Sequence, residues 1–390
     1  MITGLDRLLT NPERYLGQGR IGLCANPATI DISFNHALDL MHADKRINLT
    51  LLFGPEHGLR GDAQDMVSVA DSYDAITGIP EVSLYGASES SLTPSAEQLA
   101  RIDTLVIDIQ DIGSRYYTYA ATMAFCMQAA AKADVRVVVL DRPNPIGGMQ
   151  IEGGGIEPGL ENFCGLYSIP QRHGLTMGEL ARLYQKSYGL NCELTIIACE
   201  GWRRSQYFDD TQLPWVMPSP NMPTLDTAIV YPGMCLIEGT NISEGRGTTR
   251  PFELVGAPFI NGRVLVEALN KLELDGVVFR PCVFRPTFHK HINQACGGVQ
   301  LHVTDRQSFL PYRTGLAIIW CIKQLWPNFF GWRREPYEFR PDVPAIDLLT
   351  GTPRVRELID SGADFNKVMK AAIFGGEQYD AQREQVFLYE

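Results

Sequence analysis

The sequence lacks a long apolar run and an excess of basic residues. No stretch approaches the ~20 consecutive apolar residues of a membrane-spanning helix, and the first residues, MITGLDRLLT, lack the positive-then-apolar pattern of a signal peptide. The net charge of −11 at pH 7 has the opposite sign to the surfaces that attract nucleic acids and anionic membranes. We therefore expect a cytoplasmic protein that binds neither nucleic acid nor membrane.

Paired cysteines and the glycine patterns of nucleotide sites are also missing. The nine cysteines never occur as Cys-x-x-Cys, so we expect buried, reduced thiols rather than a disulfide framework or a zinc ribbon. The glycines at 147–148 and 153–155 do not form a Gly-x-Gly-x-x-Gly that opens a helix, and no P-loop pattern occurs. No Gly-x-Ser-x-Gly occurs, which argues against acyl transfer through serine. We expect no cofactor.

The first 150 residues contain strand patterns that alternate with helix patterns. Short apolar runs typical of buried parallel strands cover residues 21–25, 49–53, 82–85, 104–109 and 135–140. Helical spacing covers residues 33–44, 95–101 and 119–133. Because alternating strands and helices connect through right-handed crossovers, this order predicts an α/β fold with a doubly wound parallel sheet.

The length of 390 residues exceeds what one compact core usually organises, so we expect two domains. A glycine- and proline-rich stretch over residues 152–169 suggests a linker, which places a first domain at 1–155 and a smaller α+β domain at 156–390. The later patterns are helices at 177–188, 264–272 and 314–325, strands at 194–198, 277–285 and 299–304, and loops at 201–224 and 231–251. A cleft between the two domains would be a common place for a ligand.

Polar side chains follow four of the predicted strands of the first domain. Asn26 follows the first strand, and residues 54–62, 110–115 and 141–148 follow three others. In an open parallel sheet, ligands bind in the crevice beyond the carboxyl ends of the strands. We therefore expect these loops to meet at one site.

The segment GPEHGLRGD, residues 54–62, holds a carboxylate and an imidazole in a turn stiffened by proline and glycine. Glu56 and His57 are therefore candidate catalytic residues, and Arg60 is a candidate substrate contact. A glutamate partly walled by apolar residues has a raised pKa and can act as a general acid. The alternative interpretation is a solvated loop.

The segment DIQDIGSRYYTY, residues 108–119, brings two more carboxylates to a strand end. Asp108 and Asp111 are candidate catalytic residues. Arg115 could bind a substrate carboxylate with two parallel hydrogen bonds, and the ring of Tyr116 could stack on a sugar. The alternative is a structural Asp–Arg pair.

Further candidate substrate-binding residues lie in the segments DRPNPIGG, PSPNMPT and YPGMCLIEGTNISEGRGTTRP; they are Arg142, Asn144, Asn221, Glu238, Asn241, Glu244, Arg246 and Arg250. His289, in the run Phe-His-Lys-His, is expected to contact substrate rather than a metal, because no carboxylate ligand stands at a suitable spacing. Carboxylates, arginines, asparagines and aromatic rings together suit glycoside cleavage.

Six segments together resemble the exo-acting β-N-acetylmuramidase family, in the same order from about Ile21 to the C-terminus: GPEHGLRGD, DIQDIGSRYYTY, DRPNPIGG, PSPNMPT, YPGMCLIEGTNISEGRGTTRPFE and FHKHINQACGGVQLHVTD. The resemblance implies a Rossmann-like domain without a dinucleotide and a smaller C-terminal domain. It implies removal of N-acetylmuramic acid from the non-reducing end of peptidoglycan fragments, an amino-sugar substrate. It also implies that Glu56 is the catalytic glutamate.

Under this hypothesis Glu56 protonates the glycosidic oxygen and His57 orients it, while an arginine (115, 142, 246 or 250) binds the lactyl carboxylate of the sugar. The second catalytic group stays open among Asp108, Asp111, Glu238, Glu244 and the 2-acetamido group of the substrate itself. The alternatives are a muropeptide-binding module without activity and a metal-dependent hydrolase of another amino-sugar bond.

Overall fold

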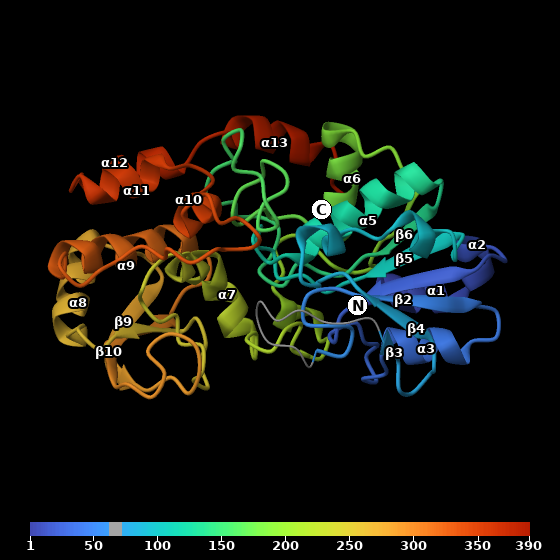
Figure 1. The fold of residues 1–390 in the computed structure, drawn as a ribbon, viewed down its shortest axis with the longest axis horizontal. Helices are drawn as coiled ribbons and strands as arrows, with labels where there is room; N and C mark the ends of the chain where they lie inside the picture. Colours follow the sequence, from blue (N-terminus) through green and yellow to red (C-terminus); the bar gives the residue numbers. More distant parts are fainter. Residues whose placement is uncertain (62–71) are drawn as a thin grey trace.

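Two β-sheets, one in each of two lobes that lie side by side, organise the chain (Figure 1). The computed structural model describes residues 1–61 and 72–390. The first lobe contains a seven-stranded sheet in the order β3-β4-β2-β1-β5-β6-β7, and the second contains a three-stranded sheet in the order β8-β10-β9. The predicted site segment that begins at Gly54 ends at Asp62, which lies outside the described residues.

The sheet of the first lobe is parallel except at one edge. Its strands are β1 (Ile21–Ala25), β2 (Leu49–Gly54), β3 (Ser72–Tyr73), β4 (Pro80–Ser83), β5 (Thr104–Asp108), β6 (Arg136–Leu140) and β7 (Leu194–Ile197). Only β3 runs antiparallel to its neighbour, β4, among the pairs of the described strands. The doubly wound parallel sheet expected from the sequence is confirmed.

Successive side chains of a strand point to opposite faces, and the two faces bury two different cores. Leu105 and Ile107 of β5 pack with the core under the long helix α5, whereas Val106 between them packs with the core of α1 and α3. The helices of this lobe are α1 (Gly4–Thr10), α2 (Pro12–Leu16), α3 (Ala37–Ala43), α4 (Ala96–Leu99), α5 (Tyr119–Ala133) and α6 (Met177–Tyr188), with the 3-10 helix η1 (Glu89–Leu92). Burial on both faces explains why the strands read as continuous apolar runs.

Helix α3 begins four residues later than its sequence pattern predicts. The side chain of Asp31 accepts hydrogen bonds from the backbone N–H groups of Ser33 and Asn35, which holds this stretch in a turn. His36 then caps the helix by accepting a hydrogen bond from the N–H of Leu38. Local side-chain bonds therefore outcompete the helix over its first expected turn.

Strand β7 completes the sheet of the first lobe, because it pairs in parallel with β6. A domain boundary at residue 155, as expected from the glycine-rich stretch, would separate β7 from this sheet. The stretch after β6 instead reaches the second lobe, where the N–H of Gly155 bonds to Phe374 and that of Glu157 bonds to Gly351, and the chain returns to the first lobe through α6. Composition alone suggested a linker here, but glycine and proline are equally suited to a long, ordered connection.

The second lobe packs helices against one face of its antiparallel sheet. Its elements are α7 (Leu225–Met234), η3 (Cys235–Gly239), β8 (Leu254–Ala257), α8 (Gly262–Leu269), η4 (Asn270–Leu272), β9 (Val277–Phe284), β10 (Cys296–Val303), α9 (Pro311–Leu325), α10 (Ala345–Thr350), α11 (Arg354–Asp360) and α12 (Phe365–Ala372). The last helix of the chain, α13 (Gly376–Glu384), follows them. In β9, Phe279 is buried while Val278 and Val283 are exposed. This one-sided sheet fits the smaller α+β unit expected from the sequence.

The segment at 231–251, expected to be a loop, is helical at its start. Residues 231–234 end α7, and η3 continues directly from them, although Pro232 lies inside the helix. Proline lacks a backbone N–H, so a helix that contains it loses one of its i→i−4 hydrogen bonds. Its place close to the end of a short helix makes that loss small, so the loop prediction for these residues is wrong.

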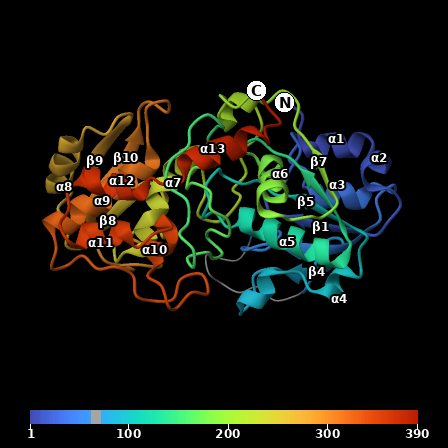
Figure 2. The same ribbon diagram turned by 90° about the horizontal axis from the view of Figure 1, so that it is seen from above.

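Both ends of the chain attach to the first lobe (Figure 2). The N–H of Ile2 bonds to the carbonyl of Glu200 (3.0 Å), and the N–H of Arg204 bonds to the carbonyl of Glu390 (2.9 Å). Helix α13 packs on α6, so the C-terminal segment returns from the second lobe to the first.

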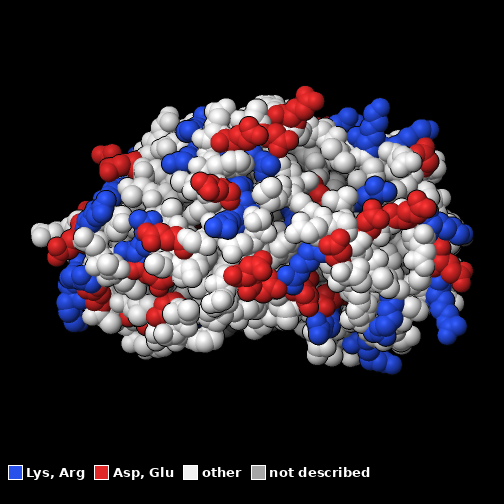
Figure 3. All heavy atoms as spheres, turned by 180° about the vertical axis from the view of Figure 1, so that it is seen from behind, with Lys and Arg blue, Asp and Glu red and all other residues white. Residues whose placement is uncertain are grey.

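The remaining sequence expectations concern thiols and surface. All nine cysteines are free, and eight of them are buried, as expected. Within the described residues, every helix is too short or too polar to cross a bilayer. Acidic and basic side chains are interspersed over the face seen in Figure 3.

Candidate active site

A pocket with an empty volume of about 450 Å³ lies where the turn after β2 and the start of α5, with the residues directly before it, meet four segments from later in the chain. It is lined by Glu56, His57, Tyr116, Tyr117, Thr118, Tyr119, Cys164, Ser219, Asn221, Met222, Tyr231, Glu238, Arg246, Phe252, Tyr337 and Glu338.

The turn after β2 carries the first carboxylate. The N–H of Gly58 bonds to the carbonyl of Pro55 (2.9 Å), which closes the turn around Glu56 and His57. His57 has a φ of 74°, a left-handed conformation that residues with a side chain rarely adopt. Such strained backbone clusters at functional sites, because the surrounding structure has to hold it in place.

Glu56 is held by a hydroxyl from a neighbouring segment. The hydroxyl of Thr118, directly before α5, donates to Oε2 of Glu56 at 2.7 Å. Glu56 is only 4% exposed, so its carboxyl group stands among protein atoms rather than in bulk water. The bond fixes the direction of the carboxyl group toward the pocket that it lines.

A second carboxylate, Glu238 at the end of η3, lines the same pocket. Arg246 donates to its Oε1 at 2.7 Å, and the hydroxyl of Tyr337 donates to its Oε2 at 2.7 Å. Arg246 also lies 3.4 Å from Glu244 and stands over the ring of Phe252. Glu238 is thus an oriented, ion-paired group, which suits a carboxylate that has to stay in one position.

A third carboxylate, Glu338, was not among the sequence candidates. The hydroxyl of Tyr85 donates to its Oε2 at 3.1 Å. Burial first, and then the charges of Glu338, Glu238 and Glu56, raise the pKa of the Cys164 thiol well above its ordinary value. This shared influence on one buried sulfur indicates that the three carboxylates converge.

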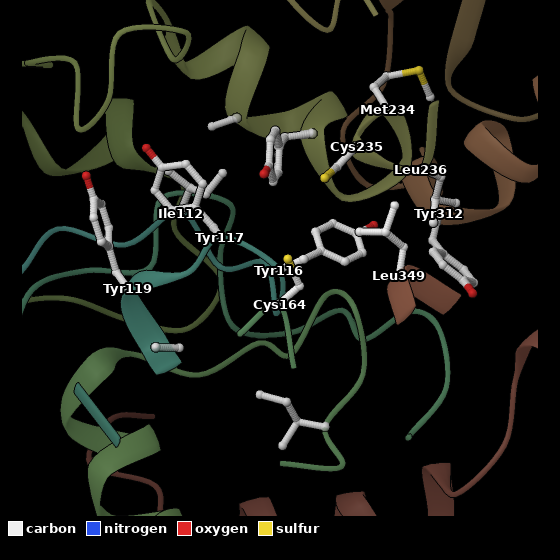
Figure 4. Close-up of a cluster of buried hydrophobic side chains, with 14 of the residues drawn as sticks. Ile112, Tyr116, Tyr117, Tyr119, Cys164, Met234, Cys235, Leu236, Tyr312 and Leu349 are labelled. Carbon is white, nitrogen blue, oxygen red and sulfur yellow. The ribbon is translucent and has the colours of Figure 1, made fainter. Parts of the chain in front are cut away.

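Three tyrosines at the start of α5 and directly before it, Tyr116, Tyr117 and Tyr119, line the pocket, and Figure 4 shows their side chains. The hydroxyl of Tyr116 donates to the carbonyl of Pro232, and that of Tyr119 donates to the carbonyl of Pro218 (2.6 Å). These hydroxyls therefore hold the later segments in place, while the rings line the space. Burial raises the pKa of both phenols.

Asp108 and Arg142 pair with each other instead of lining the pocket. Arg142 donates to both oxygens of Asp108, with Nη2 to Oδ2 at 2.9 Å, and also to the carbonyl of Ile30. Both side chains are buried. The structural Asp–Arg pair that was the alternative interpretation is therefore formed, but with Arg142 as the partner.

Four further candidates serve to join loops at the strand ends. Asn26 exchanges hydrogen bonds with the backbone of Gln110, and Asn144 bonds to the carbonyl of Leu175. Arg115 donates to four backbone carbonyls, those of Gly154, Gly155, Ile169 and Leu349, and Asp111 accepts from the N–H of Gly113. None of these four lines the pocket.

The other candidates also lie outside it. Arg60 pairs with Asp39 and Asp74, and Arg250 pairs with Glu253. Glu244 is fully buried and lies 3.0 Å from His289 and 2.9 Å from Lys290. Burial alone would raise the pKa of its carboxyl group, but the charge of Lys290 and the hydrogen bond with His289 together hold that pKa below the ordinary value. Asn241 bonds to the backbone of residues 329 and 331.

Of the sequence candidates, the pocket therefore brings together six: Glu56, His57, Tyr116, Asn221, Glu238 and Arg246. It adds residues that no motif singled out, chiefly Thr118, Tyr337 and Glu338. Thr118 lies inside the motif DIQDIGSRYYTY but was not among its candidate residues. Tyr337 and Glu338 belong to a stretch, 336–340, without a motif, so only the fold reveals them.

Comparison with known protein families gives a match over almost the whole chain. Residues 21–226 match the family model described as exo-β-N-acetylmuramidase NamZ, N-terminal, and residues 229–389 match its C-terminal counterpart. The chain is 46% identical over 387 residues to the peptidoglycan β-N-acetylmuramidase NamZ of Bacillus subtilis (strain 168), covering 99% of this chain and 91% of that protein.

Two crystal structures of DUF1343 family proteins from Bacteroides fragilis NCTC 9343 have the same fold. The first is 32% identical with a TM-score of 0.90, and the second is 28% identical with a TM-score of 0.76. Each comparison covers 100% of this chain and 99% of the other.

Proposed function

The chain belongs to the exo-β-N-acetylmuramidase NamZ family, and on this premise we propose that it is a glycosidase that releases N-acetylmuramic acid from the non-reducing end of peptidoglycan fragments. The observation that carries the proposal is the pair of Glu56 and Glu238 in one pocket, each carboxyl group oriented by its own hydroxyl donor. Two oriented carboxyl groups are what glycoside hydrolysis generally requires.

In the proposed reaction Glu56 is the general acid. It donates its proton to the glycosidic oxygen while the bond between that oxygen and the anomeric carbon breaks. The leaving sugar departs with that proton as its hydroxyl group. The bond from Thr118 keeps the carboxyl group directed at the oxygen, and His57 lines the pocket beside it in the same turn.

Glu238 is the second group in this proposal. The sugar ring develops positive charge at the anomeric carbon in the transition state, and a carboxylate fixed by Arg246 and Tyr337 stabilises that charge without moving. Water then adds to the anomeric carbon and gives a proton to the Glu56 carboxylate, which restores the acid for the next turnover. Asp108, Asp111 and Glu244 do not line the pocket, which leaves Glu238 of the four carboxylates considered.

Arg246 is the proposed contact for the lactyl carboxylate. Of the four arginines considered, it alone lines the pocket. Arg115 donates its hydrogen bonds to backbone carbonyls, and Arg142 is paired with Asp108. Arg250 pairs with Glu253 at an exposed position.

A leaving-group experiment tests the acid role. We expect Glu56→Gln to lower kcat on a muramic-acid-terminated disaccharide by about 10²–10⁴-fold, the usual contribution of a general acid. The same variant should lose much less activity on an aryl N-acetylmuramide whose phenol leaves without protonation. Glu97→Gln, at an exposed position on α4, is the matched control and should cleave both substrates like the wild type.

Equal losses of Glu56→Gln on both substrates would contradict a role as acid. No release of sugar by the wild type would instead favour a binding module without activity. The cytoplasmic location expected from the sequence stays a prediction, which cell fractionation would check.

A further inference from the structure

A second, larger depression lies on the outer side of the segments that close the candidate active site. This cationic groove is lined by Thr240, Asn241, His289, Lys290, His291, Gly331, Trp332, Arg333, Arg334 and Glu335. Its empty volume is about 1220 Å³, and it opens to solvent. Three of these residues are permanently basic and one is acidic, on a chain whose net charge is −11.

The groove is formed by two segments, around residues 240 and 332, that are joined by backbone hydrogen bonds. Thr240 and Trp332 form an isolated β-bridge, and the N–H of Arg333 bonds to the carbonyl of Gly239 at 2.9 Å. The indole N–H of Trp332 bonds to Asp360 at 3.0 Å, which fixes its half-buried ring at the edge of the groove. A fixed aromatic ring beside basic groups is suited to a sugar that carries a negative charge.

The same two segments reach into the candidate active site. Glu238, three residues before Asn241, and Glu338, three residues after Glu335, line that pocket. Three residues span at most ~11 Å of chain, so the two sites are near neighbours.

Buried charges also connect the two sites. Arg246 of the pocket contacts both Glu238 and Glu244, and Glu244 contacts His289 and Lys290 of the groove. Lys290 further donates to the carbonyls of residues 237 and 242, on either side of Glu238. A charge bound in the groove would therefore act on the groups that orient Glu238.

We propose that the cationic groove is a second sugar subsite that binds a carboxylate borne by the substrate beyond the cleaved bond. The inference rests on the proposed function. Peptidoglycan glycan alternates N-acetylglucosamine and N-acetylmuramic acid, so with one muramic acid in the pocket the next one stands two sugars along. Where the stem peptide has been removed, that sugar carries its own free lactyl carboxylate. The charge of the groove is complementary to that group.

The test compares two peptide-free substrates, a disaccharide and a tetrasaccharide, each with muramic acid at the non-reducing end. We expect the wild type to have a higher kcat/KM on the tetrasaccharide by about 10-fold, the order of one charge-assisted hydrogen bond. Arg334→Gln should bring this ratio down toward one. Arg263→Gln, an exposed arginine on α8 of the same lobe, should keep the wild-type ratio.

Chemical modification of the substrate distinguishes a lactyl carboxylate of the glycan from a carboxylate of the stem peptide. Reducing the second lactyl carboxyl group to an alcohol should remove the advantage of the tetrasaccharide. An advantage that instead follows a stem peptide placed on the disaccharide would overturn the assignment to the glycan. Equal kcat/KM of the wild type on both glycans would overturn the subsite and leave the proposed function standing, whereas no cleavage of either would overturn both.

Discussion

At the scale of single residues, the four arginines considered for the lactyl carboxylate show how partners decide a role. Arg115 is surrounded by backbone carbonyls, and burial lowers the pKa of its guanidinium to about 10. Arg142 is paired with Asp108, while Arg250 is half exposed. Only Arg246 combines a buried ion pair with a place in the pocket. The side-chain chemistry is identical in all four, so the difference comes from their neighbours.

Thr118 offers a prediction at this scale, because its hydroxyl orients Glu56. Thr118→Val keeps the shape of the side chain and removes the donor. A hydrogen bond to a charged group contributes about 1.5–3 kcal/mol, so we expect kcat to fall about 10- to 100-fold with little change in KM. Steady-state kinetics on the disaccharide would measure this split.

Thr118→Ser is the matched control, since it restores the hydroxyl and should recover most of the lost kcat. If the serine variant were as slow as the valine variant, packing rather than the hydrogen bond would explain the loss. A change confined to KM would likewise speak against a positioning role.

At the scale of elements, helices α7 and α9 cross at two glycines, Gly233 and Gly315, where their backbones touch. A Cβ on Gly233 of α7 would stand 1.7 Å from the carbonyl oxygen of Pro311, and one on Gly315 of α9 would stand 2.1 Å from the carbonyl oxygen of Gly233. The two backbones therefore touch directly. This crossing holds α7, whose residue Tyr231 lines the pocket, at a fixed distance from the rest of the second lobe.

We expect Gly233→Ala to destabilise the protein strongly, because the clashing atom is backbone and cannot swing away. Overpacking costs about 1–3 kcal/mol and occasionally more, and here we expect the upper end. Differential scanning calorimetry should show a clear fall in the unfolding temperature.

Gly376→Ala provides the comparison within another helix. It lies at the start of α13, where an added Cβ would meet no atom within 4 Å. There the same substitution should leave the unfolding temperature unchanged or raise it slightly, because alanine favours helix more than glycine does. Equal effects at both positions would mean that the close crossing is not what limits residue 233.

At the scale of the whole molecule, a buried carboxyl group lies between the lobes. Glu152 follows the sheet of the first lobe, yet it accepts a hydrogen bond from the N–H of Tyr312 at the start of α9 in the second (3.1 Å). Its ion-pair partner Arg172 is 3.6 Å away. Burial outweighs that attraction and raises the pKa of Glu152 from 4.5 to about 7.

This pKa predicts how stability depends on pH. The folded protein binds the proton of Glu152 more tightly than the unfolded chain does, so the contribution is complete below pH 4.5 and is lost as pH rises through 7. At 1.36 kcal/mol per pH unit the loss is about 3 kcal/mol. We expect Glu152→Gln to remove this part of the slope in unfolding experiments between pH 4.5 and 8.

Glu97→Gln, at its exposed site, should give a stability curve parallel to that of the wild type. Because Asp141, whose pKa burial raises to about 6, titrates in the same range in every variant, only the difference between curves reports on Glu152. Parallel curves for Glu152→Gln and the wild type would contradict the prediction.

The sequence by itself determined the parallel strands of the first lobe, the helices between them and the place of Glu56, but not α1, α2 or β3. Apolar runs and helical spacing are local properties, and they predicted residues 119–133 and 177–188 with the bounds of α5 and α6. The turn after β2 could be found the same way, since Glu56 and His57 directly follow a strand. Helices α10 to α13 were missed, because they are mostly short and depend on packing rather than on a strong pattern of their own.

Only the tertiary structure decided which residues accompany Glu56. Thr118, Glu238 and Tyr337 are 62, 182 and 281 positions away from it, and no local pattern records that they meet. The fold likewise committed Asp108 and Arg142 to each other and buried them. The physical reason is that the spacing of apolar residues reports only the local environment of each segment. A pocket depends on contacts between distant segments, and those contacts are determined by packing and by charge pairing.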